Sequence, residues 1–258
     1  MPPQKLFCYR LPDEVDPAEF QGFTVVIIDV LRATSTITNA LANGAAKVIP
    51  CLTIEDALNT RVQLAPKQVE LCGERQGAKI DGFDRGNSPE EYDPESVLDQ
   101  TLVFTTTNGT RAMIHAEQAD EILLASFLNL NSVVRYLEGK ANVAILCSGT
   151  NRKRTLEDEL LAGAIACCFE SANCEINGTT RALQLQWKAE LNDQGHPRDL
   201  FESLKKGQGG INLVKRGLEQ DIRFCSQIDC LKVVCHYDPN QRAIRVSQPH
   251  SRSANPTP

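Results

Sequence analysis

The sequence predicts an α/β fold in which helices flank a mainly parallel sheet, and three observations support this prediction. Apolar segments of strand length alternate with segments of helical periodicity over the first 150 residues. The first apolar segment, 23–30, is an uninterrupted run rich in β-branched residues, as expected of a strand buried on both faces. With 41% hydrophobic and 23% charged residues, the composition is that of a globular protein with a packed core.

The elements of the first half follow from apolar periodicity and its punctuation. Gly44 ends the first helix, and Thr53 is placed to cap the second. The predicted elements are a strand at 23–30, a helix at 33–43, a strand at 47–52, a helix from 54 and a short strand at 69–72. The Gly-, Asp- and Pro-rich segment 73–100 interrupts this alternation and is too polar for the core. A loop of that length is usually functional or disordered.

The alternation resumes after residue 100 and becomes mostly helical toward the end of the chain. The predicted elements are a strand at 101–105, a helix from 109, a strand at 121–125, a helix at 131–137, a strand at 142–147, a strongly apolar helix at 156–169, and a strand pair near 231–236 and 243–246. We expect two α/β lobes, 1–125 and 126–246, with the active site in a cleft at the C-terminal ends of the strands. The segment 247–258 lacks apolar residues and is predicted to be a disordered tail.

Charge and hydropathy limit the classes of partner. The net charge of −6 argues against a nucleic-acid-binding protein. The first ten residues lack the apolar core of a secretory signal, and no apolar run approaches the roughly 18 residues of a membrane span. We therefore expect a cytoplasmic protein with no membrane partner, and a homodimer is the default expectation for such an enzyme.

The 10 cysteines favour buried thiols in a reducing compartment over disulfides. Five of them lie inside apolar patterns: Cys51, Cys72, Cys147, Cys167 and Cys168. The series Cys225, Cys230, Cys235, next to His236, raises the possibility of zinc. Structural zinc sites usually use tighter cysteine pairs, so we favour the non-metal interpretation.

Polar residues gather at four predicted strand ends, which is where open α/β sheets bind ligands. At the first, Asp29 closes a strand, and Arg32, Thr34 and Ser35 fall at the start of a helix. A helix N-terminus suits an anion, although these hydroxyls could also be a simple N-cap cluster. The second strand end repeats this composition, with Thr107, Asn108, Gly109, Thr110 and Arg111. Asn-Gly alone would indicate only a turn.

The other two strand ends add carboxylates. Glu74 and Arg75 open the long loop, which closes at Asn87 and Ser88. Ser148 and Gly149 follow the strand at 142–147, and Glu157 and Asp158 lie in the first turn of the apolar helix. Acidic residues at that position are often only complements to the helix dipole.

Together these residues outline a phosphoryl-transfer site at one edge of the sheet. Guanidinium groups bind phosphate oxygens, and carboxylates are ligands that Mg²⁺ prefers. Such a metal polarises the phosphoryl oxygen and activates bound water. We predict Mg²⁺ ligands at Asp29, Glu74, Glu157 and Asp158, and converging arginines at Arg32, Arg75 and Arg111. We expect Arg32 and Arg111 to contact the transferred phosphoryl group and Arg75 to contact the substrate's other anions.

Other phosphatase chemistries fail on spacing. Leu31 stands where the haloacid-dehalogenase type needs a second aspartate after Asp29, and Lys153 stands where Cys147 would need an arginine. No phosphate-binding P-loop is present, and Gly207-Gln-Gly209-Gly210 is better interpreted as a turn before a helix. Metal-activated water and a transient phosphoenzyme both remain open.

The chain resembles the 2-phosphosulfolactate phosphatase family of the coenzyme M pathway. The resemblance covers about residues 23–170 and is carried by VVIIDVLRATSTITNAL, LCGERQGAKIDGFDRGNSPEE, TTTNGTRA, and CSG followed by LEDELLAGAI. It implies Mg²⁺-dependent hydrolysis of (R)-2-phospho-3-sulfolactate to (R)-3-sulfolactate and phosphate. The implied catalytic residues are Asp29, Arg32, Glu74 and Arg111. The implied substrate-binding residues are Thr34, Ser35, Arg75, Asn87, Ser88, Thr107, Asn108, Gly109, Thr110, Ser148 and Gly149.

Two positions depart from the family pattern and leave alternatives open. Gln76 stands where the family has glycine, and Arg85 stands where an apolar residue is expected before GNSP. Either change could adapt the pocket to another phosphorylated hydroxy acid. A non-catalytic anion-binding protein on the same fold is a further alternative, but it would not need the acidic residues beside the arginines.

Overall fold

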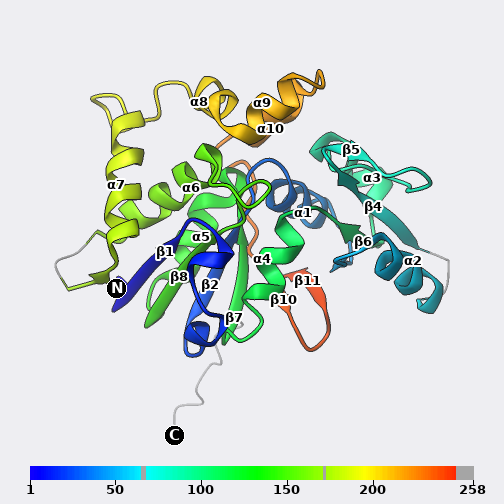
Figure 1. The fold of residues 1–258 in the computed structure, drawn as a ribbon, viewed down its shortest axis with the longest axis horizontal. Helices are drawn as coiled ribbons and strands as arrows, with labels where there is room; N and C mark the ends of the chain where they lie inside the picture. The colour runs from blue at the N-terminus through cyan, green and yellow to red at the C-terminus, as the bar shows by residue number, and fades with distance from the viewer. Residues whose placement is uncertain (65–67, 171–172, 248–258) are drawn as a thin grey trace, which may run out of the picture.

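The computed structural model describes residues 1–64, 68–170 and 173–247, whose strands form one 11-stranded sheet (Figure 1). The strand order is β5-β4-β6-β3-β11-β10-β7-β2-β8-β1-β9. The strands are β1 (Lys5–Tyr9), β2 (Thr24–Ile28), β3 (Lys47–Pro50), β4 (Val69–Arg75), β5 (Ala78–Lys79), β6 (Thr101–Thr105), β7 (Glu121–Ala125), β8 (Asn142–Cys147), β9 (Glu175–Ile176), β10 (Cys235–Asp238) and β11 (Ala243–Val246).

The helices cover both faces of this sheet. They are α1 (Ala33–Ala42), α2 (Ile54–Gln63), α3 (Pro94–Val97), α4 (Gly109–His115), α5 (Leu130–Leu137), α6 (Leu156–Cys167), α7 (Gly178–Glu190), α8 (Leu200–Lys206), α9 (Gln208–Val214) and α10 (Glu219–Cys225). Four short 3-10 helices are η1 (Pro12–Glu14), η2 (Pro17–Phe20), η3 (Pro89–Glu91) and η4 (Phe127–Asn129). The predicted α/β fold, with a mostly parallel sheet flanked by helices, is confirmed.

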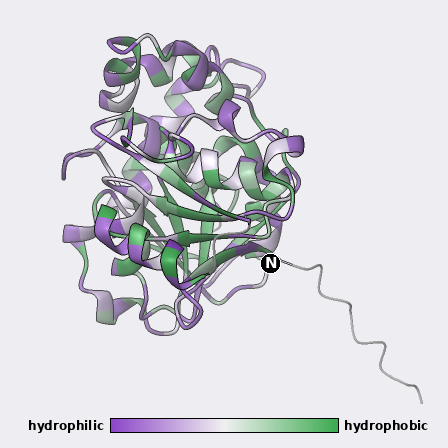
Figure 2. Cartoon of the chain, turned by 90° about the vertical axis from the view of Figure 1, so that its right-hand side faces the viewer, coloured by the Kyte–Doolittle hydropathy of each residue, from purple (hydrophilic) through white to green (hydrophobic). Residues whose placement is uncertain are grey.

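Strand β2 shows why a continuous apolar run forms a central strand. All five of its residues are buried. Val25 and Ile27 pack into the core beneath α1 and α4, whereas Val26 and Ile28 pack into the core beneath α5 and α6. Hydrophobic residues accordingly concentrate in the strands, and hydrophilic residues on the outer helices and loops (Figure 2). Because β2 has no solvent face, its C-terminal end is a rigid base for the turn that follows.

The C-terminal hairpin occupies the middle of the sheet. Strand β10 pairs antiparallel with β7, and β11 pairs antiparallel with β3. The hairpin therefore joins a parallel half built on β2, β7 and β8 to a second half built on β3, β4 and β6. The predicted strand pair is confirmed, with the first strand beginning at Cys235 instead of near residue 231.

Most predicted elements appear with bounds shifted by a few residues. Thr53 caps α2 as predicted, because its side chain accepts a hydrogen bond from the Asp56 backbone. The long loop 73–100 contains β5, η3 and α3. Strand β1 was not predicted from the sequence, and it pairs in parallel with β8 and β9.

Three further expectations concern the chain as a whole. The 11-stranded sheet interleaves strands from the two predicted lobes, since β8 lies between β1 and β2, and the division at residue 125 stays a prediction. The predicted tail, apart from Ser247, lies outside the described residues. No helix among the described residues is long and apolar enough to cross a membrane. Cytoplasmic location and a homodimer stay predictions.

The cysteines carry free thiols, and several are placed as expected. Cys51, Cys72 and Cys147 are buried, whereas Cys167 is half-buried and Cys168 is exposed. The expectation of burial is wrong for Cys168, which is the residue after the last turn of α6 and is exposed.

Candidate active site

A cavity of about 560 Å³ lies where β2, β4 and β6 end. Residues from the loops after β2, β4, β6 and β8 contribute to it, together with residues from α9 and the turn that follows α9. The lining residues are Asp29, Leu31, Arg32, Glu74, Gln76, Gly77, Asn87, Thr106, Thr107, Asn108, Thr150, Asn151, Gly209, Asn212, Leu213, Lys215 and Arg216. The lining is mostly polar and contains both carboxylates and cations, as an anion-processing site requires.

Asp29 is positioned by the turn between β2 and α1. The Thr34 hydroxyl donates to the Asp29 carbonyl at 2.9 Å and accepts from the Asp29 backbone N–H at 3.1 Å. Ser35 donates to the Val30 carbonyl at 2.8 Å. Thr34 and Ser35 are fully buried and do not line the cavity. These two hydroxyls therefore close the turn on backbone groups instead of facing a substrate, which corrects their predicted role.

The start of α4 lies directly against Asp29. A Cβ built on Gly109 would lie 2.8 Å from the Asp29 Oδ2 and 2.8 Å from the Ala33 Cβ, so only glycine permits this approach. Thr110 does not reach the cavity, because its backbone N–H and hydroxyl face the Thr106 Oγ1, each at 3.3 Å. Gly109 thus serves close packing around Asp29, and Thr110 helps to begin the helix.

Glu74 links two loops at the cavity wall. Its Oε1 accepts from the backbone N–H and from the hydroxyl of Thr107, each at 2.9 Å, and its Oε2 accepts from the Gly77 N–H at 2.5 Å. Gly73, one residue earlier, has a φ of 139°, and a Cβ there would lie 2.0 Å from the Thr105 carbonyl oxygen. Glycine at 73 therefore allows β4 to approach β6 closely enough for Glu74 to reach Thr107.

The two acids of α6 face backbone groups behind the cavity. Asp158 accepts hydrogen bonds from the backbone N–H groups of Val30 at 2.9 Å and Gly149 at 3.0 Å, and from the Ser148 hydroxyl at 3.4 Å. Glu157 accepts from the Gly209 N–H at 2.9 Å. Its other oxygen, Oε2, is buried without a hydrogen-bond partner among the described residues.

These bonds locate the predicted residues of the fourth strand end. Glu157, Asp158, Ser148 and Gly149 do not line the cavity, and they hold together the loops that do. Of the four predicted metal ligands, the structure brings Asp29 and Glu74 to the cavity.

Three buried carboxyls have a raised affinity for protons, and burial is the largest cause for each. Burial, followed by the nearby charges of Asp158 and Glu74, raises the pKa of Asp29 to about 8. Burial, followed by the charge of Asp158, raises the pKa of Glu157 to about 8. Burial raises the pKa of Asp158 to about 6, against hydrogen bonds from Val30 and Gly149 that lower it. The site therefore concentrates negative charge that a cation would relieve.

Arg32 is the one predicted arginine that reaches the cavity. Its guanidinium forms a buried ion pair with Asp221 of α10 and donates to the Gly77 carbonyl at 2.9 Å. Asp221 also accepts from the Ser88 hydroxyl at 2.6 Å, which explains why Ser88 does not line the cavity. Sequence reasoning did not identify Asp221, because nothing in the α10 segment indicates a partner 189 residues away.

Arg75 and Arg111 lie elsewhere, which corrects the prediction of a three-arginine pocket. Arg75 donates to the Leu52 carbonyl at 3.1 Å and to the Thr105 hydroxyl at 2.8 Å. Arg75 follows Glu74 in the same strand, and consecutive strand residues point to opposite faces. Arg111 pairs with Asp13 at the surface.

Three of the predicted substrate-binding residues line the cavity, namely Asn87, Thr107 and Asn108. The Asn87 Oδ1 is buried and has no hydrogen-bond partner among the described residues. Since the oxygen and nitrogen of an amide exchange places by a flip, Asn87 can present its NH₂ group to an anion. The Asn108 side chain accepts from the Asn151 N–H at 3.1 Å and so joins two of the lining loops.

Sequence reasoning missed the contribution of α9 and the turn after it. Gly209, Asn212, Lys215 and Arg216 line the cavity, although the sequence match that suggested the site ended near residue 170. The sequence feature that could have indicated this contribution is the adjacent pair of cations, Lys215 and Arg216, which follows Gly207-Gln-Gly209-Gly210. Gly207 is the residue before α9, as the predicted turn before a helix requires.

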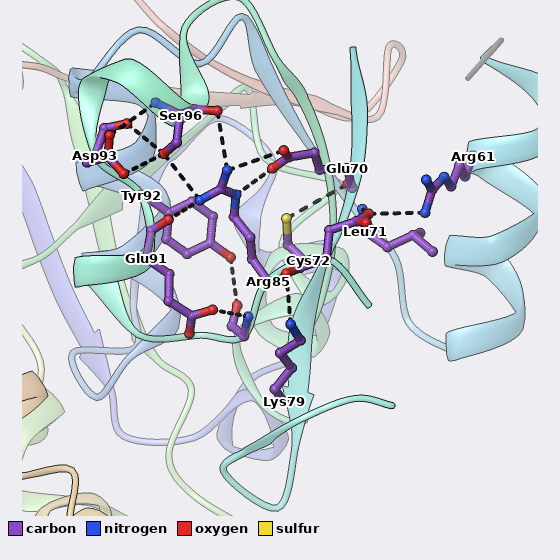
Figure 3. Close-up of polar contacts among 12 residues, drawn as sticks. Arg61, Glu70, Leu71, Cys72, Lys79, Arg85, Glu91, Tyr92, Asp93 and Ser96 are labelled. Carbon is purple, nitrogen blue, oxygen red and sulfur yellow. Dashed lines mark hydrogen bonds and ion pairs between the residues drawn. The ribbon is translucent and has the colours of Figure 1, made fainter. Parts of the chain in front are cut away.

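The two departures from the family pattern have different placements. Gln76 lines the cavity and has a φ of 55°. Arg85 does not line it, and its side chain joins β4 to the η3–α3 segment (Figure 3). Its guanidinium contacts the Glu70 carboxylate at 2.5 and 3.2 Å, donates to the Glu91 carbonyl, and lies 5.6 Å from the ring centre of Tyr92. Of the two, only Gln76 can alter the pocket directly.

The donor set fits Mg²⁺ but not a metal enclosed by protein alone. Among residues 1–64, 68–170 and 173–247, no three His, Cys, Asp or Glu side chains are grouped so as to hold a metal ion. Mg²⁺ usually takes one or two carboxylates and completes its octahedron with water and substrate phosphate. Asp29 and Glu74, with carboxyl oxygens at the cavity, match that requirement.

Comparison with known proteins gives a consistent result. A family model described as 2-phosphosulpholactate phosphatase matches residues 9–240. A probable 2-phosphosulfolactate phosphatase of Thermotoga petrophila is 43% identical over 212 residues, which are 82% of this chain and 87% of that protein. Proteins with the same description from Caldanaerobacter subterraneus and Clostridium acetobutylicum are 37% and 36% identical, over 88% and 87% of this chain and 92% and 94% of their own lengths.

Proposed function

The chain belongs to the 2-phosphosulpholactate phosphatase family, and from this membership we propose that it is a phosphoric monoester hydrolase that converts (R)-2-phospho-3-sulfolactate to (R)-3-sulfolactate and phosphate with the help of Mg²⁺. The product would enter coenzyme M synthesis or other sulfonate metabolism. The observation that supports the proposal most directly is the pairing of Asp29 and Glu74 with Arg32 in one polar cavity.

Each of these residues has a task in phosphoryl transfer. The Arg32 guanidinium has five N–H donors, and its two recorded bonds to Asp221 and Gly77 leave donors for the phosphoryl oxygens. Asp221 fixes the orientation of that guanidinium. The side chains of Asn87 and Asn108, at the cavity wall, are placed to donate to the remaining oxygens of the ester.

Asp29 and Glu74 are the residues that would hold Mg²⁺. When bound, the ion neutralises the phosphoryl charge and lowers the pKa of a bound water. Asp29 lies in the rigid turn after β2, and Glu74 is fixed by Thr107 and Gly77, so the two carboxylates need little rearrangement to hold a ligand. Glu157 and Asp158 support these positions through backbone contacts.

The test is phosphate release from a panel of small phosphoesters, with and without Mg²⁺. We expect the sulfonated ester to be the best substrate, and activity to disappear in EDTA and return with Mg²⁺. The fold should survive chelation, as circular dichroism would show, because one hydrated ion does not hold this core together. Undiminished turnover in excess EDTA, with metal content shown to be negligible, would remove Mg²⁺ from the proposal.

A related substrate is the second candidate, and Gln76 is the observation that favours it. Its side chain lines the cavity at a position where the family pattern has glycine, so the space available to the substrate differs. The same panel separates the two candidates if it includes other phosphorylated hydroxy acids. A higher kcat/KM for one of these than for the sulfonated ester would favour the second candidate.

A further inference from the structure

Helices α8–α10 lie across the end of the sheet that carries the cavity (Figure 1). Two buried attachments hold them there. The Glu157 carboxylate accepts from the Gly209 N–H at 2.9 Å, and Asp221 pairs with Arg32. Gly207 and Gly209 press against Glu157 so closely that a Cβ on either would lie within about 2 Å of its carboxylate. The position of this segment relative to Asp29 and Arg32 is therefore well determined.

Two cations of this segment enter the cavity lining without a partner. The side chains of Lys215 and Arg216 form no recorded hydrogen bond or ion pair with any described residue, and both residues are exposed. Arg216 lies directly against Gly77, since a Cβ built on Gly77 would be 3.1 Å from the Arg216 Nε. Gly77 in turn donates its N–H to Glu74 and accepts from Arg32 through its carbonyl. Both cations are thus at the mouth of the cavity with their donors unused.

The other arginines considered for anion binding are already engaged. Arg32 pairs with Asp221 and donates to the Gly77 carbonyl. Arg75 donates to the Leu52 carbonyl and to the Thr105 hydroxyl. Arg111 forms an ion pair with Asp13. Within the described part of the chain, Lys215 and Arg216 are therefore the cavity-lining cations that have no partner, beside a site whose wall carries Asp29 and Glu74.

We propose that Lys215 and Arg216 form a second-anion subsite that binds the non-transferred sulfonate and carboxylate of the substrate, while Arg32 binds the phosphoryl group. The proposal rests on the proposed function and assigns substrate selection to the α8–α10 segment. A small ester with additional strong anions gains two charge-assisted contacts there, and a plain phosphomonoester gains none. Both residues are specificity determinants, and neither contacts the bond that breaks.

The experiment compares Arg216→Gln and Lys215→Gln with wild type on three esters: 2-phospho-3-sulfolactate, 2-phospholactate, which lacks the sulfonate, and p-nitrophenyl phosphate, which lacks both anions. We expect KM for the sulfonated ester to rise about 10-fold or more in each variant while kcat changes little. The ratio of kcat/KM for the sulfonated ester to that for p-nitrophenyl phosphate should fall by a similar factor. An equal loss on all three esters, or no loss, would overturn the proposal.

Lys206→Gln is the matched control, because Lys206 is an exposed lysine of α8 that does not line the cavity. It removes the same charge from the same segment and should leave the ratio unchanged. A parallel fall in that variant would mean that overall charge, and not a subsite, is responsible.

Calorimetric binding of 3-sulfolactate, which has no phosphate, separates this inference from the proposed function. Weaker binding in Arg216→Gln supports the subsite even if wild type hydrolyses none of the esters. Equal binding by wild type and both variants overturns it even if wild type is an active phosphatase. Thermal unfolding of each variant shows whether a loss comes from the fold.

Discussion

Asp29 lies where the fold disfavours its charged form. It is 7% exposed, and burial with the neighbouring Asp158 and Glu74 raises its pKa. The native fold thus places a carboxylate where its charge is unfavourable in the absence of a cation. Residues at functional sites commonly carry such an electrostatic cost, because the charge is needed for the reaction rather than for stability.

We expect Asp29→Asn to reduce kcat by about a hundredfold or more, because the amide keeps the shape but loses the charge that would hold Mg²⁺. Stability should be equal or higher, since a buried charge is removed. Mg²⁺ should raise the melting temperature of wild type and not that of the variant. Turnover within a few-fold of wild type would assign Asp29 a structural role.

At this scale, prediction from sequence brought several strand-end side chains to the cavity, and their roles in metal and substrate binding stay predictions. Asp29, Arg32, Glu74, Thr107 and Asn108 all line the cavity as expected. It failed where local hydrogen bonding decides the direction. Small hydroxyls readily bond to nearby backbone groups, as Thr34 and Ser35 do. For Arg75, the alternation of side chains along β4 already contained the answer.

Among the elements, the η3–α3 segment is joined to β4 by one arginine. The Arg85 side chain is 17% exposed and its partner Glu70 is 24% exposed, and the same guanidinium also bonds to Glu91 and Ser96 (Figure 3). A planar fork makes these contacts together, which the single ammonium of lysine cannot do.

We therefore expect Arg85→Lys to lower the free energy of unfolding by about 1–3 kcal/mol. Arg61→Lys is the control. Its partner is Asp84, the two side chains are 35% and 39% exposed, and such surface pairs contribute about 1 kcal/mol or less. Urea denaturation of both variants measures the difference. Equal, small effects would show that the Arg85 contacts contribute little.

The elements themselves were largely predictable, with two instructive exceptions. Strand β1 has only five residues in a half-buried, alternating pattern, and so short an apolar segment does not stand out. The α8–α10 segment was predicted to be helical, but its position over the cavity depends on the contacts of Gly209 with Glu157 and of Asp221 with Arg32. Contacts of that kind join distant parts of the chain and leave no local pattern.

For the whole molecule, the raised pKa values of Asp29, Glu157 and Asp158 link stability to pH. The unfolded-state pKa of such groups is about 4, whereas burial raises the pKa of Glu157 to about 8 in the folded protein. Between these values the folded state binds more protons than the unfolded state. Stability from these groups is therefore fully present below about pH 4 and is lost as the pH rises toward 8.

We expect Glu157→Gln to remove part of this dependence. In EDTA, its free energy of unfolding relative to wild type should rise by roughly 2 kcal/mol between pH 5 and pH 8, because the variant has no charge to bury. Urea denaturation at several pH values gives the difference. Glu90→Gln, which changes an exposed carboxylate, should follow wild type throughout. If the free energy of unfolding of Glu157→Gln also followed that of wild type at every pH, ionisation of Glu157 would not destabilise the folded state.

The central position of the C-terminal hairpin has a consequence for how the protein is made. Strands β3, β4 and β6 cannot join β2, β7 and β8 in one sheet until β10 and β11 lie between them. On a ribosome, residues 235–246 emerge after the other described strands, so until then the nascent chain exposes two incomplete sheets, each with an open edge. An open sheet edge is a template for pairing with other chains. Newly made protein is therefore most prone to aggregate before this hairpin emerges, and a ribosome that stalls shortly before residue 235 leaves a product that cannot close its sheet.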